Sequence, residues 1–151
     1  MIFMRFSTLI ILILLGTLMR AQDITHIGCH RIQGYIIPEE VQLFPEPNRF
    51  TPSIEDIFKA EKILRQGIRR GKCNNLPIKM IRNNYIRQYV GYYDGNDNKE
   101  ILMIFTKKGI ISDESRFKGF INIFDGGNNH WRITVNIDNG QINDLGINGP
   151  G

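Results

Sequence analysis

A single carboxylate interrupts an otherwise apolar helical pattern, and it is the residue best placed for acid/base chemistry. Glu61 falls between Phe58 and Leu64, on the face that helical spacing would bury. A buried carboxylate needs a cationic or hydrogen-bonding partner, or it takes up a proton. Arg87 and His130 are the two partner candidates. The pattern therefore predicts either a structural ion pair or an acid/base group in a cleft between helix and sheet.

Nothing else in the sequence completes a catalytic site around Glu61. The chain has no Gly-Xaa-Ser-Xaa-Gly, no His-Glu-Xaa-Xaa-His and no paired carboxylates in a recognisable spacing. We therefore expect a non-enzymatic protein without a cofactor or metal, and a small hydrolase is kept as an alternative. The side chains expected to contact a ligand are Glu61, Arg87, Tyr89, His130 and Arg132.

Tyrosines and arginines are interleaved around the strand expected at 85–93. The residues concerned are Arg82, Tyr85, Arg87, Tyr89, Tyr92 and Tyr93. Such a surface could stack on the bases of a nucleic acid or bind another ligand, but tyrosine is also simply a good strand residue. Because the N-terminus predicts export, as argued below, we expect a protein, peptide or glycan as partner and no nucleic acid.

Cys29 and Cys73 are the only cysteines. In an oxidising compartment such a pair predicts a disulfide, which would close a loop of roughly 45 residues and contribute about 3–4 kcal/mol. Two free thiols are the second possibility. A zinc site that adds His26 and His30 is the third. A thiol enzyme built on Cys29 has no partner motif, and the disulfide would abolish it.

Residues 94–98 begin like a calcium-binding loop. The EF-hand pattern requires glycine at its sixth position, where Lys99 stands, and glutamate at its twelfth, where Phe105 stands. A hairpin turn explains this segment better, and residues 125–128 are interpreted in the same way.

The N-terminus predicts export. Arg5 precedes an apolar run over 6–15, and Ala21 supplies a small residue for cleavage, which is the layout of a signal peptide. The run is shorter than the roughly 20 residues that a membrane span needs. We expect residues 1–22 to be removed and the protein to be secreted or periplasmic, with an uncleaved membrane anchor as the alternative. Loss of Arg5 and Arg20 lowers the formal charge of +4 by two, and no membrane contact beyond this segment is expected.

The remaining chain predicts an arm and one domain. Residues 23–50 show no clear period and contain three prolines, so we expect an irregular arm that lies on the domain. Residues 51–151 form the domain itself. Thr51 as cap, a following proline and a basic end before Gly71 predict a helix over 52–70. Its buried face is expected to consist of Ile54, Ile57, Phe58, Leu64 and Ile68.

The pattern after the helix is typical of strands. The expected strands cover 85–93, 100–106, 119–124, 131–138 and a return strand ending at 147. Trp131, Ile133 and Val135 alternate with polar residues and should face the core. Asn139 and Gly140 are a strong signal for a tight hairpin turn. One helix on an antiparallel β-meander of four to five strands predicts a two-layer α+β fold.

Four stretches resemble small secreted proteins of Bacteroidetes-type bacteria that have no assigned function. They are residues 54–64, residues 87–92 and the closing residues around 125–128 and 147–149. The resemblance implies export but no activity. The order of elements is also similar to cystatin-like folds, at the level of fold only.

The cystatin likeness suggests one alternative function, peptidase inhibition. Cystatins carry Gln-Xaa-Val-Xaa-Gly in their first hairpin, whereas here Gln88-Tyr89-Val90 is followed directly by Gly91, one residue early. The leading hypothesis is a secreted or periplasmic binding or structural module of unknown ligand, with a cystatin-type inhibitor and a small hydrolase as alternatives.

Overall fold

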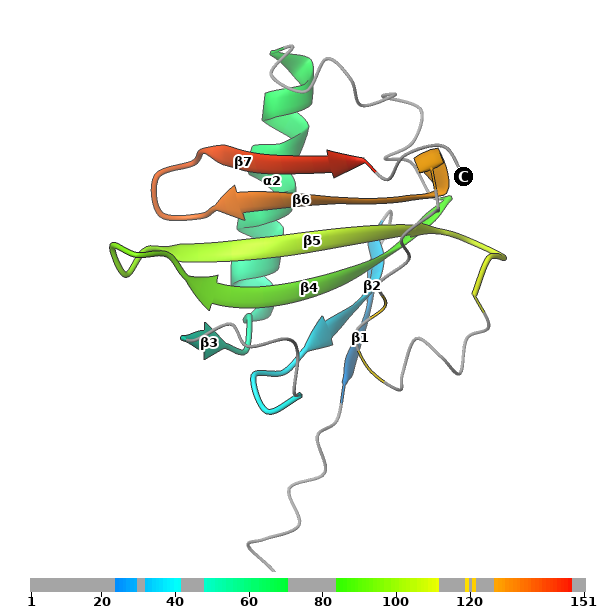
Figure 1. The fold of residues 1–151 in the computed structure, drawn as a ribbon, viewed down its shortest axis with the longest axis horizontal. Helices are drawn as coiled ribbons and strands as arrows, with labels where there is room; N and C mark the ends of the chain where they lie inside the picture. Colours follow the sequence, from blue (N-terminus) through cyan, green and yellow to red (C-terminus); the bar gives the residue numbers. More distant parts are fainter. Residues whose placement is uncertain are drawn as a thin grey trace, which may run out of the picture.

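The computed structural model describes residues 24–29, 32–41, 48–70, 84–111, 119, 121 and 127–147. These residues form seven strands of one sheet, an α-helix and a short 3-10 helix (Figure 1). The strands are β1 (Thr25–Cys29), β2 (Ile32–Ile37), β3 (Arg49–Phe50), β4 (Tyr85–Tyr93), β5 (Lys99–Lys107), β6 (His130–Asn136) and β7 (Ile142–Ile147). The helices are α2 (Ile54–Arg69) and η2 (Gly127–Asn129).

The sheet has the order β1-β2-β4-β5-β6-β7, and β3 pairs with the same edge of β4 as β2. Strands β4 to β7 follow one another in chain order and are antiparallel, as in a meander, but β5 pairs directly with β6, so the strand predicted over 119–124 does not lie between them. Helix α2 crosses one face of this sheet (Figure 1). The α+β class is therefore confirmed as one helix packed on a mostly antiparallel sheet.

Cross-strand register determines which side chains face α2. Tyr89, Met103 and Ile133 are aligned on β4, β5 and β6 and belong to the buried core beneath the helix. Trp131 and Val135 belong to the same core, so the predicted core face of this strand is confirmed. The central strand β5 is mostly buried on both faces.

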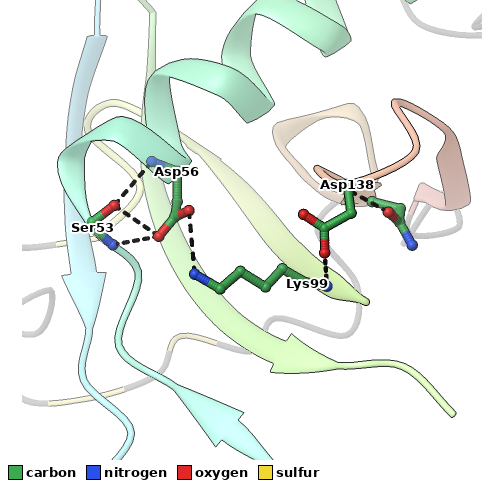
Figure 2. A network of polar contacts seen from close by, with 5 residues as sticks. Ser53, Asp56, Lys99 and Asp138 are labelled. Carbon is green, nitrogen blue, oxygen red and sulfur yellow. Dashed lines mark hydrogen bonds and ion pairs between the residues drawn. The ribbon is translucent and has the colours of Figure 1, made fainter. Parts of the chain in front are cut away.

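Helix α2 begins with a capping box at Ser53, two residues after the predicted cap, Thr51. The Asp56 backbone N–H donates to Ser53 Oγ over 3.1 Å, and the Ser53 backbone N–H donates to the Asp56 carboxylate over 3.0 Å. Figure 2 shows that Lys99 continues this network: its Nζ lies 3.7 Å from Asp56, and its backbone N–H donates to Asp138. Burial alone would raise the pKa of Asp56, but the hydrogen bonds with Ser53 and the charge of Lys99 lower it.

Ser53→Ala is expected to destabilise the protein by about 1 kcal/mol, because a helix N-terminus then loses its capping oxygen. The measurement is urea unfolding followed by far-UV circular dichroism. Thr51→Ala is the matched control. Its hydroxyl accepts only an exposed hydrogen bond from the Glu39 backbone, so it should cost less. A larger loss for Thr51→Ala would show that the cap is assigned to the wrong residue.

The buried face of α2 is rotated from the predicted one. Ile54 and Phe58 are 45% and 43% exposed, so their predicted place in the core is wrong. Ala60 and Gly67 are buried in their place, and the predicted Ile57 and Leu64 are buried as expected. The buried residues of α2 are Ile57, Ala60, Glu61, Leu64 and Gly67.

The N-terminal segment joins the sheet, so the predicted irregular arm is wrong for most of its described residues. Strands β1 and β2 form an antiparallel pair, and β2 runs parallel to β4 with Gly34 opposite Arg87. Parallel partners are distant in sequence and leave no hairpin signal between them. Arg49 binds the end of β2: its guanidinium donates hydrogen bonds to the carbonyl oxygens of Ile37 and Pro38.

Two predicted turns are in place, with one change of geometry. The Asp94 carboxylate accepts from the backbone N–H groups of Asn96 and Asn98, which closes the β4–β5 turn. The β6–β7 loop covers 137–141 and is wider than a two-residue hairpin turn. Of the predicted central pair, only Gly140 has a positive φ, +74°.

Candidate functional site

Glu61, Arg87 and Tyr89 meet between α2 and β4. Arg87 and Tyr89 share the helix-facing side of β4, since side chains two positions apart in a strand point the same way. Glu61 Oε1 lies 2.8 Å from Arg87 Nε and accepts a 2.9 Å hydrogen bond from the Tyr89 hydroxyl. The three residues are 2%, 1% and 0% exposed. The predicted burial of Glu61 and its pairing with Arg87 are therefore confirmed, and Tyr89 joins the pair.

The Arg87 guanidinium lies over an aromatic ring that is itself part of a stack. Arg87, Phe105 and Trp131 are aligned on β4, β5 and β6. Arg87 Cζ lies 5.1 Å from the centroid of the Phe105 ring, and Phe105 stacks on Trp131 at 3.7 Å with an interplanar angle of 5°. A cation over an aromatic face gains more attraction in a desolvated site. The stack keeps water from the ion pair, so the attraction between Glu61 and Arg87 is less screened than at a surface.

Gly34 allows β2 to approach this cluster closely. It is the register partner of Arg87 in the parallel strand pair. A Cβ atom at this position would lie 2.7 Å from the Arg87 carbonyl oxygen and 2.8 Å from the Tyr89 ring. Gly34 is not among the predicted site residues. The signal that points to it is a glycine inside an apolar stretch, which marks close backbone approach in a strand.

The cluster is a closed structural ion pair and not an open acid/base site. Burial raises the pKa of the Tyr89 hydroxyl well above its ordinary value, and the negative charge of Glu61 raises it further. Tyr89 therefore stays protonated and donates to Glu61. The other carboxylate oxygen of Glu61 lies 3.6 Å from Arg65 Nη2 at the helix surface. These contacts hold α2 on the sheet, and the burial of all three cluster members keeps a substrate away from them.

His130 and Arg132 lie on the opposite face of the sheet. They alternate with Trp131 along β6, which faces the helix, so they point away from α2. His130 is buried, with Nδ1 at 2.9 Å from Thr106 Oγ1, whereas Arg132 is exposed. The structure thus brings three of the five predicted site residues together and separates the other two. His130 is not the partner of Glu61.

The stability of the protein should fall in acid partly because of His130. Burial lowers the pKa of His130, and the positive charge of Arg132 lowers it further. The unfolded chain, with a histidine pKa of about 6.5, then binds the proton more readily than the folded chain. This residue should leave stability unchanged above about pH 6.5 and reduce it as the pH falls below that value.

Urea unfolding midpoints at about pH 7.5 and pH 5 measure this effect for the wild type and His130→Gln. The carboxylates titrate in both proteins, so the difference between their pH dependences isolates the histidine. The wild type should lose more stability on acidification. An equal loss in both proteins would contradict the assignment of His130 as a buried neutral side chain.

The tyrosine-rich strand does not form one continuous binding surface. Tyr85 and Tyr89 lie in the core beneath α2. Tyr92 points to the other face, where its hydroxyl bonds to a β6 threonine over 3.1 Å. Tyr93 packs on Phe50 with ring centroids 5.0 Å apart. The predicted aromatic surface is divided between two faces, and Arg82 lies outside the described residues.

The segment that resembles a cystatin motif lies in the middle of β4. Strands β2 and β5 pair with Gln88-Tyr89-Val90 on its two sides, and all three residues are buried. The Gln88 side chain also bonds to the backbone of Gly119 and Ile121. A segment enclosed by two strands cannot enter the cleft of a peptidase, so its placement speaks against inhibition through these residues.

Several predicted features lie outside the described residues. They are the leader over 1–22, Cys73, His30 and most of the strand expected over 119–124. Cys29 ends β1, but the disulfide predicted with Cys73 stays a prediction, because Cys73 is not among the described residues. Among the described residues, no three or more His, Cys, Asp or Glu side chains group as a metal site. Within the same residues, no helix combines the length and apolar character of a membrane span.

The outer face of α2 concentrates exposed positive charge. Of the three acids in α2, Glu61 is buried and Asp56 belongs to the capping box, which leaves Glu55 exposed. The partly apolar beginning of this face is formed by Ile54 and Phe58. The exposed cations of this face are not among the predicted site residues, since basic residues near a helix end are expected from the helix dipole alone. The exposed cations are Lys59, Lys62, Arg65, Arg69 and Arg70.

Comparison of the chain with protein-family models, with curated proteins and with solved structures found no match. The proposed function below therefore rests on the geometry of the described residues.

Proposed function

We propose that this protein is a secreted or periplasmic, non-enzymatic binding module that contacts its partner through the outer face of α2. The observation that carries the proposal is the separation of charge on this helix. Glu61 is buried against the sheet with Arg87 and Tyr89. Arg65 is exposed beside its ion pair with Glu61, and the remaining exposed cations are Lys59, Lys62, Arg69 and, at the C-cap, Arg70. Ionisable groups that are paired in the core stabilise the fold, and those in solvent are available to a partner.

The two alternative functions have less support. A hydrolase needs an acid/base group that a substrate can reach, and the Glu61 cluster is buried. A cystatin-type inhibitor needs an exposed hairpin tip, and the matching tripeptide is buried within β4. The partner of a binding module is a protein, peptide or glycan that carries negative charge, because like charges across an interface are unfavourable. No cofactor is part of the proposal.

Fractionation of cells that express the full-length chain tests the proposal. The protein should be retained with the cell envelope at low ionic strength and released by about 0.5 M salt, since surface charge pairs are screened. Lys62→Gln with Arg69→Gln should shift the protein to the soluble exported fraction. Both residues are exposed, so the variant should melt like the wild type.

The matched control removes the same charge elsewhere. Lys107→Gln with Lys108→Gln alters two exposed lysines at the end of β5 and should leave retention unchanged. Equal release of both variants would mean that net charge and not the α2 face is responsible. A wild-type chain that is fully soluble at low salt would overturn the proposed function.

The exported material also tests the predicted processing. Its intact mass should begin between residues 21 and 23, because the leader ends there. A mass that includes Met1 would favour the uncleaved anchor. Peptide mapping without reduction should link Cys29 to Cys73, and two alkylatable thiols in the same sample would contradict the disulfide.

A further inference from the structure

We infer that one line along the outer face of α2 binds an acidic and partly apolar segment of a partner protein. The inference rests on the proposed function, because it names the partner class for the same surface. The line, here called the outer stripe, consists of Ile54, Phe58, Lys62, Arg65 and Arg69.

The outer stripe follows from helix geometry. Its members are spaced by four, four, three and four residues, so they lie on one side of a helix with 3.6 residues per turn. All are exposed. From Ile54 to Arg69 the stripe is roughly 22 Å long at 1.5 Å per residue. This spacing is also the one with which a helix surface packs against another helix.

The stripe has two chemically different ends. Ile54 and Phe58 are the large apolar side chains that α2 exposes, and they lie in its first two turns. The three cations occupy the remaining turns, and one of them, Arg65, also lies 3.6 Å from the Glu61 carboxylate. A fitting partner therefore has apolar side chains at one end of its contact and carboxylates at the other, within about 22 Å. An acidic amphipathic helix or strand of a protein meets this description.

Other anionic partners match the stripe less well. An acidic glycan pairs with the cations but offers no aliphatic side chains for Ile54. A membrane-bound amphipathic helix has its apolar residues along its whole length, whereas the outer stripe has them at one end. The protein partner uses both halves of the stripe.

The order of residues speaks against a second copy of this chain in the antiparallel arrangement that overlays the two stripes fully. A two-fold interface brings the same patch of both subunits together. Two antiparallel stripes would then place Lys62 against Lys62, Phe58 against Arg65 and Ile54 against Arg69. The like charges at the centre repel, and the apolar side chains meet cations.

Photo-crosslinking in living cells tests the inference on the full chain. A benzophenone amino acid replaces Phe58, and in the matched control it replaces Ile110, which is similarly exposed at 47% but lies beyond the end of β5. The Phe58 position should give a discrete crosslinked protein that is absent at Ile110. Mass spectrometry of the crosslinked peptide should find apolar residues at the crosslink and an excess of Asp and Glu nearby.

Charge reversal then tests the cationic half. Lys62→Glu with Arg69→Glu should lower the crosslink yield by about tenfold or more, because the approaching acids are now repelled. Replacement of the acids in the crosslinked peptide by lysine should restore the crosslink yield of the charge-reversed variant. Recovery of this kind would be specific to a charge-paired protein interface.

Three results would overturn the inference. A crosslink to lipid or polysaccharide, or to a peptide without acidic residues, removes the acidic protein as partner but leaves the proposed binding function in place if envelope retention still depends on α2. A crosslink of equal yield at Phe58 and Ile110 shows that the outer stripe is not selective. Absence of both crosslinking and retention removes the proposed function together with the inference.

Discussion

Arg87→Met is expected to lower the free energy of unfolding by about 3–5 kcal/mol, because it leaves the Glu61 carboxylate buried without its cation. Glu61→Gln should have a similar effect, since the Arg87 guanidinium then keeps its charge inside the core. Against a typical domain stability of about 5–15 kcal/mol, either loss is large. The measurement is chemical denaturation with the melting temperature as a second readout.

The structure offers a matched control for this prediction. Arg65 contacts the other oxygen of the same carboxylate, over 3.6 Å, but its side chain is 47% exposed. Arg65→Met should therefore cost under about 1 kcal/mol, as exposed ion pairs do. A loss for Arg65→Met as large as that for Arg87→Met would mean that removal of any cation near Glu61 has the same effect and that burial is not decisive.

A double-mutant cycle separates pairing from packing. If Glu61 and Arg87 stabilise each other, the double variant should lose less than the sum of the two single variants, by about 1–3 kcal/mol. The double variant leaves no buried charge without its partner. Additive losses would remove the pairing as the explanation, although both residues are buried.

Trp131→Ala is expected to cost about 3–5 kcal/mol. The ring is 1% exposed and stacks on Phe105, which in turn lies beneath Arg87. Removing it leaves a cavity and weakens the desolvation of the ion pair. Trp131 is the only tryptophan of the sequence, so the emission of the wild type should shift on unfolding and report the transition directly.

Two further variants define what Trp131 contributes. Trp131→Phe keeps an aromatic ring in the stack and should cost less than the alanine change. Its indole Nε1 is buried without a hydrogen-bond partner among the described residues, so no hydrogen bond is lost. Phe58→Ala at an exposed position should change stability by about 0.5 kcal/mol or less. If Trp131→Ala melted at the same temperature as the wild type, the assignment of the Trp131 ring to the core face would be wrong.

The sequence allows the meander and the buried pair to be predicted because both depend on local patterns. Alternation from 131 to 137 places Trp131 in the core, and the Tyr-rich run gives β4 the same bounds that the structure has. Glu61 could be identified because a carboxylate broke an apolar pattern. Arg87, on the tyrosine-rich strand, is the first candidate partner, but the sequence alone does not exclude His130.

The features that were missed depend on contacts without a strong local signal. The expected face of α2 is chosen from its large apolar side chains, whereas the buried face also includes Ala60 and Gly67, which carry little hydrophobicity and give no signal in the pattern. His130 looked equivalent to Arg87 as a partner. His130 is the neighbour of Trp131 in β6, so its side chain points to the opposite face of the sheet. That His130 belongs to β6 becomes clear only when the register of β5 and β6 is known.

The parallel pairing of β2 with β4 determines the order in which the chain can fold. The partners Gly34 and Arg87 are about 50 residues apart in sequence, so their contact closes a long loop. The meander from β4 to β7 needs only neighbouring strands and can form first. Until β2 arrives, the edge of β4 offers unpaired backbone groups to other chains. Pairing of β2 therefore does more than enlarge the sheet: it covers the edge of β4 and protects the folding chain from aggregation.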